Sequence, residues 1–251
     1  NHLHRGATRA AGRHHQVHVQ TDCDGALERI GAGPERKRRV ISHAETLVIA
    51  YHEGGHAVVQ RVLPKCDPVQ KVTIISRGMA LGYTMALPTE DRYLQSKTEF
   101  EDKIAGLLGG NVSERMVFGD TTTGSSNDIE KATDLARRMV TEFGMSDRLG
   151  PLSFGKRDEM IFLGRSMGEQ RDYSDETSKT IDEEVRAIVD RAFERASQVL
   201  EIHRDRLDPL SAKLLAQATV DRVRFASFFA ALPPPGTPPG PPAPRPPPGA
   251  C

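Results

Sequence analysis

The chain has 251 residues, and its 34 basic and 34 acidic side chains cancel to a formal net charge of zero. This balance provides no bulk attraction to nucleic acid, so we expect no nucleic-acid partner, and three cysteines without a CxxC spacing argue against a disulfide framework. No apolar run reaches the ~20 residues of a membrane-spanning helix, so we expect the chain as written to be soluble, with no membrane segment.

The N-terminal region lacks the apolar side chains that a core needs. Residues 1–24 hold five histidines and almost no large apolar residue, so we expect a disordered or aberrant arm. Residues 25–41 are expected to form the end of a short helix, then a Gly-Pro break and a basic linker. The folded domain is therefore expected to start at residue 42.

A first helix is predicted from Ser42 to Leu63. Ser42 and Glu45 have the spacing of a capping box, which marks a helix start. Pro64 disfavours a helical conformation in the residue before it, which marks the end. Two strands, 69–75 and 80–88, are predicted to follow as a hairpin or meander.

The rest of the domain is predicted to be helical. Ser96 with Glu99 forms a second capping box, Asn127 and Ser174 are predicted N-caps, and Gly144 is a predicted C-cap. The fold class is thus mainly α, with a small sheet or hairpin near the first helix. The expected helices are 96–117, 127–144, 174–203, 208–216 and 221–231, with a loop at 145–173.

The C-terminal tail, 232–251, has a different composition from the domain. Eleven of the seventeen residues from 233 to 249 are proline. Such a segment favours an extended polyproline conformation and cannot bury a core. We therefore expect a disordered tail, and a folded domain that spans 42–231.

The first helix carries a metal-binding pattern in "YHEGGHAVV". His52 and His56 are four residues apart, so both rings lie on one helix face and can hold one zinc ion. Glu53 lies beside them, where a carboxylate can take a proton from metal-bound water as a general base. Histidines that share a face by chance are the alternative, but Gly54 and Gly55 each cost about 0.8–1.0 kcal/mol in a helix interior. Their presence indicates that another segment or a substrate packs closely against this helix.

A catalytic zinc needs a third protein ligand and an open position. No third histidine lies at the close spacing that would complete the site. Glu114, in "GGNVSERMVFGD", and Asp128, in "TTTGSSNDIEKAT", both qualify by chemistry. These residue types and spacings leave the two carboxylates as equal candidates.

Several blocks of the chain, in order, resemble the peptidase domain of the FtsH family of membrane-anchored, ATP-dependent zinc metalloproteases. They are "GPERKRRVIS", "AYHEGGHAVV", "DPVQKVTIISRGMALGYTMALP" and "GGNVSERMVFGDTTTGSSNDIEKATDLARRMVTEFGMSDRLGPLSFG". The resemblance spans roughly residues 25–225. It implies one Zn²⁺ per chain with His52, His56 and Asp128 as ligands. It also implies Glu53 as the general base and Glu114 as a nearby supporting residue.

The resemblance also implies how substrate binds and what the domain assembles with. An edge strand in such proteases holds unfolded protein substrates by backbone pairing, and Ala80, Leu81, Gly82, Tyr83 and Thr84 occupy that strand here. The family forms hexamers in which an AAA+ ATPase ring delivers substrate. It acts at the cytoplasmic face of the bacterial inner membrane or at an organelle equivalent.

The sequence departs from this family in several respects, and we expect both its ATPase and its membrane anchor to be absent from the chain. It contains no G-x-x-x-x-G-K-[ST] phosphate-binding loop, so ATP is expected only through an ATPase domain that is absent here. Residues 25–41 are interpreted as the remnant of an ATPase lid helix and its linker, in a fragment or a frame-disturbed product. The primary hypothesis is a zinc endopeptidase; the alternative is an inactive or accessory binding module that associates with full-length FtsH-like subunits.

Overall fold

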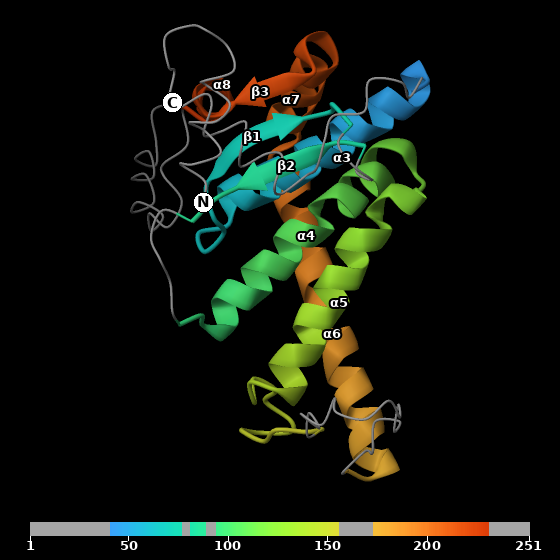
Figure 1. The fold of residues 1–251 in the computed structure, drawn as a ribbon, viewed down its shortest axis with the longest axis vertical. Coiled ribbons are helices and arrows are strands. Elements are labelled where there is room, and N and C mark those ends of the chain that lie inside the picture. Colours follow the sequence, from blue (N-terminus) through green and yellow to red (C-terminus); the bar gives the residue numbers. More distant parts are fainter. Residues whose placement is uncertain (1–40, 77–80, 89–93, 156–172, 231–251) are drawn as a thin grey trace, which may run out of the picture.

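The computed structural model describes residues 41–76, 81–88, 94–155 and 173–230. In these residues the fold is mainly α-helical with one small antiparallel sheet, which confirms the predicted fold class (Figure 1). The helices are α3 (His43–Val62), α4 (Lys97–Phe118), α5 (Ser126–Thr141), α6 (Asp175–Ile202), α7 (Arg204–Gln217) and α8 (Arg222–Ser227). The strands are β1 (Val69–Thr73), β2 (Tyr83–Ala86) and β3 (Thr219–Asp221), and η1 (Thr123–Ser125) is a 3-10 turn.

Three predicted segments lie outside the described residues: the arm 1–24, nearly all of 25–41, and the tail 232–251. The same holds for Ala80 and for 156–172 of the predicted loop. None of the helices in the described part of the chain is long and apolar enough to cross a membrane.

Local capping positions the starts of the longest helices as predicted. The Ser42 side chain accepts from the Glu45 amide, and Glu45 accepts from the Ser42 amide at 3.0 Å. The same reciprocal pair, Ser96 and Glu99, opens α4, and Ser174 caps α6. These caps satisfy backbone donors that a helix start leaves unpaired.

The start of α5 differs from the prediction. Asn127 is not its cap: the N-cap is Ser125, and Asn127 lies in the first turn. Thr122 caps the η1 turn, and η1 runs directly into α5. The helical conformation therefore begins before Asn127.

The C-terminal elements also differ in their bounds. Helix α7 begins at Arg204, four residues before the predicted start, and Pro209 lies inside it. Its buried residues Leu207, Leu210 and Leu214 contribute to the core, and this packing outweighs the poor helix propensity of proline. The predicted helix 221–231 is shorter than expected and is preceded by a third strand that was not predicted.

The sheet has the order β2-β1-β3, with both pairings antiparallel. The predicted hairpin of β1 and β2 is confirmed, although both strands are shorter than 69–75 and 80–88. Val72 pairs with Thr84 on one side and with Val220 on the other. Strand β2 is thus an outer strand of the described sheet, and β1 and β2 run alongside α3 (Figure 1).

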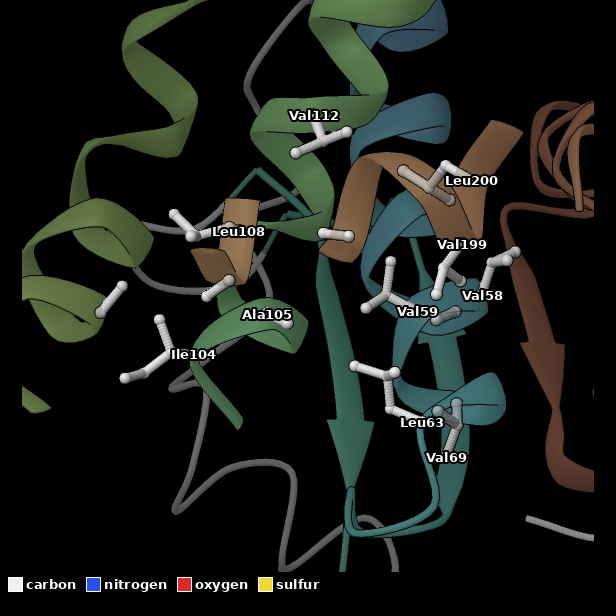
Figure 2. Packing of buried hydrophobic residues seen from close by; sticks show 14 of the residues in the cluster. Val58, Val59, Leu63, Val69, Ile104, Ala105, Leu108, Val112, Val199 and Leu200 are labelled. Carbon is white, nitrogen blue, oxygen red and sulfur yellow. The ribbon is translucent and has the colours of Figure 1, made fainter. Parts of the chain in front are cut away.

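The core forms where α3, α4 and α6 meet. Figure 2 shows Val59 of α3, Ala105 and Leu108 of α4, and Leu200 of α6 in one buried cluster. Glycines 54 and 55 allow other segments to pack closely against α3, as expected from the sequence, and these segments are helices. A Cβ on Gly55 would lie 2.3 Å from the Gly109 carbonyl oxygen of α4. One on Gly54 would lie 2.9 Å from Ser211 Oγ of α7.

Candidate metal centre and catalytic carboxylate

Three potential metal ligands converge at the crossing of α3, α4 and α5. His52 and His56 project from α3 with their Nε2 atoms 3.0 Å apart, and both rings are buried. Asp128, in the first turn of α5, places Oδ2 3.3 Å from each of these nitrogens. The three residues therefore lie close enough to bind one metal ion.

The spacing of these atoms fits a zinc ion. Zinc bonds to nitrogen and oxygen are about 2.0–2.2 Å, so neighbouring corners of a tetrahedral site lie about 3.3–3.6 Å apart. The two 3.3 Å edges to Asp128 match this value, and the 3.0 Å edge between the rings is slightly shorter. Two imidazoles and one carboxylate are also a donor set that zinc accepts.

The outer nitrogens of both rings have partners that orient them. His52 Nδ1 lies 2.6 Å from Glu114 Oε1, and His56 Nδ1 lies 2.9 Å from the Gly106 carbonyl oxygen. The Gly110 amide is 3.3 Å from the same His56 nitrogen, but the carbonyl contact is shorter, so we assign the proton to Nδ1. A neutral ring that donates through Nδ1 directs its Nε2 lone pair inward. Two lone pairs and a carboxylate oxygen then face one another, an arrangement that a cation stabilises.

Glu114 also connects the histidines to the turn before Asp128. Its Oε2 accepts from the Thr122 amide at 2.6 Å, and the Asn111 side chain donates to Ser125 Oγ at 2.9 Å. These contacts hold the η1 turn, which leads into α5 and its Asp128. Sequence reasoning missed Thr122 and Asn111, because both contacts depend on where α4 meets the turn.

The electrostatics of the site are dominated by its carboxylates. Burial lowers the pKa of His52, but hydrogen bonds to Asp128 and Glu114 outweigh burial and raise it to about 10. Burial raises the pKa of Asp128, but its contacts with His52 and His56 reverse this and hold it well below its usual range. A proton and a metal ion therefore compete for the same histidine nitrogen.

Gly110 of α4 leaves the space that the two rings occupy. A Cβ at this position would lie 2.5 Å from His52 Cε1 and 2.6 Å from His56 Nε2. Any larger residue would displace both imidazoles. The adjacent glycines 109 and 110 inside a predicted helix were a visible sequence signal for this close approach, as Gly54 and Gly55 were on α3.

Glu53 lies on the same helix turn as the histidines and is 5% exposed. Burial raises the pKa of its carboxyl group, while His56, His52 and a hydrogen bond from Thr84 act in the opposite direction. Thr84 comes from β2, so this outer strand lies directly against the candidate base. Leu81, Gly82 and Tyr83 precede it, while Ala80 lies outside the described residues.

Known proteins match most of the chain. A model of peptidase family M41 matches residues 39–228. The ATP-dependent zinc metalloprotease FtsH 1 of Sphaerobacter thermophilus is 48% identical over 229 residues, which cover 91% of this chain and 35% of the relative. The ATP-dependent zinc metalloprotease FtsH of Bacillus subtilis is 48% identical over 222 residues, which cover 88% of this chain and 35% of the relative. The ATP-dependent zinc metalloprotease FtsH of Pseudothermotoga lettingae is 51% identical over 201 residues, which cover 80% of this chain and 32% of the relative.

The chain thus spans about a third of the length of these curated relatives. The matched region includes the three potential ligands and the neighbouring carboxylate of the candidate centre, which are His52, His56, Asp128 and Glu53. The family match confirms the resemblance to the FtsH peptidase domain that the sequence blocks indicated. The chain belongs to peptidase family M41.

Proposed function

We propose that this chain is a zinc-dependent endopeptidase domain that hydrolyses peptide bonds of unfolded or membrane proteins. The convergence of His52 Nε2, His56 Nε2 and Asp128 Oδ2 beside the Glu53 carboxylate carries this proposal. Those three atoms would hold one Zn²⁺ per chain and leave a fourth position open. When bound there, zinc would polarise a substrate carbonyl and lower the pKa of a water molecule to about 7.

The remaining chemistry belongs to the side chains of this domain. Glu53 would accept a proton from the attacking water and donate it to the leaving amine nitrogen. Burial raises the pKa of Glu53 above the usual value for a glutamate, which makes its carboxylate a stronger proton acceptor. Glu114 would act in support, because its hydrogen bond to His52 Nδ1 orients the ring and fixes its tautomer.

Strand β2 would hold the substrate in an extended conformation. It is an outer strand of the described sheet and contacts Glu53 through Thr84, so a chain paired to it would lie close to the metal. Pairing through the backbone of Leu81, Gly82, Tyr83 and Thr84 would tolerate many substrate side chains.

The partners proposed for the chain follow from its relatives, whose names describe ATP-dependent proteases. We propose that an AAA+ ATPase delivers unfolded protein to this site. The assembly would be a hexamer at the cytoplasmic face of the bacterial inner membrane or its organelle equivalent. ATP use would require an ATPase domain beyond these 251 residues.

The experiment combines metal content with cleavage of an unstructured protein such as casein. The chain should contain one zinc by atomic absorption and should cleave casein. Glu53→Gln should keep zinc and lose cleavage, whereas Asp128→Ala should lose most of the zinc. Glu201→Gln, which removes an exposed carboxylate on α6, is the matched control and should change neither.

Two outcomes would reassign the site. Full zinc occupancy in Asp128→Ala together with loss of zinc in Glu114→Ala would make Glu114 the ligand. A zinc-loaded chain that does not cleave casein would favour the accessory binding module.

A further inference from the structure

The inward face of β2 lies against the candidate base. Gly82, directly before β2, and Thr84, within it, both lie against Glu53. A Cβ on Gly82 would lie 3.0 Å from both Cγ and Oε1 of Glu53. Two positions further on, Thr84 Oγ1 lies 2.9 Å from Glu53 Oε2 and 3.1 Å from the Glu53 carbonyl oxygen.

The two contacts of Thr84 are not equivalent. A hydroxyl group carries one proton, so it donates to one acceptor at a time. The carboxylate contact is the shorter, and hydrogen bonds to an ionised acceptor are stronger than those to a neutral carbonyl. The Glu53 carboxylate is buried, so a donor at this distance decides which direction its two oxygens face.

We propose that Thr84 is a positioning residue: its hydroxyl holds one oxygen of the Glu53 carboxylate, and Gly82 leaves room for the other. This inference rests on the proposed function, in which Glu53 acts as the base. One strand would then have two separate tasks. Its backbone edge would hold the substrate, and its Thr84 side chain would hold the group that transfers the proton.

The test compares Thr84→Val, which keeps the side-chain shape without the hydroxyl, with Thr84→Ser, which keeps the hydroxyl. In crystal structures of the zinc-free chain, the Glu53 carboxylate should lose its position in Thr84→Val and keep it in Thr84→Ser. In casein cleavage, Thr84→Val should lower kcat by about tenfold or more with normal zinc content and KM within about twofold, because misplacing a reacting group costs rate rather than binding. Thr84→Ser should stay within about threefold of the unchanged chain.

The control is Thr180→Val on α6, which removes a hydroxyl that donates to the Glu176 carbonyl far from the centre. It should change neither the Glu53 position nor kcat. An unchanged Glu53 position or an unchanged kcat in Thr84→Val would overturn the proposal. So would a loss in Thr84→Ser as large as in Thr84→Val, since packing of the methyl group would then explain both.

Different measurements test the role of Glu53 and the role of Thr84. Cleavage that survives Glu53→Gln would overturn the base assignment. The crystal structures would still decide whether the Thr84 hydroxyl holds the Glu53 carboxylate, because that readout needs neither zinc nor activity.

Discussion

His52 has a carboxylate near each of its ring nitrogens. Glu114 lies on the Nδ1 side at 2.6 Å and Asp128 on the Nε2 side at 3.3 Å. Both favour the charged imidazolium and raise the pKa of the ring to about 10, against the lowering caused by burial. The residue is thus protonated at neutral pH unless a metal ion displaces the proton.

Zinc binding should therefore release a proton. We expect the apparent zinc affinity to rise about tenfold per pH unit between pH 6.5 and 8.5. This whole range lies below the His52 pKa of about 10, so each zinc ion bound displaces one proton from the ring. Competition with a chromophoric chelator across this range would measure the slope. Glu114→Gln, which weakens the hold on the proton, should make the slope shallower, and an affinity independent of pH would contradict the prediction.

The raised pKa of His52 also makes the stability of the metal-free domain depend on pH. A histidine with a raised pKa contributes stability that is fully present below the unfolded value, near 6.5. That contribution is lost as the pH rises toward about 10.

The crossing of α3 and α4 depends on glycines that face each other. Gly55 and Gly109 leave no space for a side chain between the helix backbones, since a Cβ on either would lie within 2.8 Å of the other's carbonyl oxygen. The contact brings α4, with its Gly106 carbonyl and Glu114 carboxylate, to the histidines of α3. The helix crossing and the metal centre are therefore one structural feature.

Gly55→Ala should lower the free energy of unfolding by about 2–3 kcal/mol, because the methyl group would force the helix backbones apart. Gly106→Ala is the matched control on the same helix interface. Its Cβ would lie 3.1 Å from Gln60 Cγ, on a flexible side chain, and at ordinary contact distance, 3.6 Å, from Cys66 Sγ. Alanine also gains up to about 1 kcal/mol of helix propensity. Urea denaturation should show a larger loss of unfolding free energy for Gly55→Ala than for Gly106→Ala. Equal losses would show that the close approach of the α3 and α4 backbones does not control stability.

At the scale of the molecule, Asp102 connects three segments. Its side chain on α4 is fully buried, and one oxygen lies 2.8 Å from Arg195 Nη1 of α6. The other oxygen accepts from the Lys65 amide in the turn after α3, at 3.1 Å. Asp102 thus links α6 to α4, which carries Glu114, and to the turn after α3, the helix that carries the histidines.

Arg195→Ala should destabilise the fold by about 2–3 kcal/mol, since it leaves a buried carboxylate without its counter-charge. This value is below the 3–5 kcal/mol of a fully buried pair because Arg195 is 40% exposed. Arg148→Ala, which breaks an exposed pair with Glu183 and a longer 3.8 Å contact with Glu184, should cost less than about 1 kcal/mol. Chemical denaturation would compare them, and similar losses for both would contradict a special role for Asp102.

Sequence patterns were sufficient to predict features that depend on a few residues close together in the chain. The capping boxes at Ser42 and Ser96 predicted the starts of α3 and α4, because each involves residues three apart. The spacing of His52 and His56 placed both on one helix face for the same reason. The glycine pair at 54 and 55 predicted that another segment packs closely against α3, but it did not identify that segment as α4 or α7.

Features that join distant segments needed the tertiary structure. Spacing alone could not separate Glu114 from Asp128, because both lie far along the chain and only the crossing of α3, α4 and α5 puts one on each side of the His52 ring. Strand β3 is three residues long, and it forms only because β1 offers it a partner. The contact of Thr84 with Glu53 likewise exists because β2 lies along α3. Local chemistry thus determines which residues can act, while long-range packing determines which of them meet.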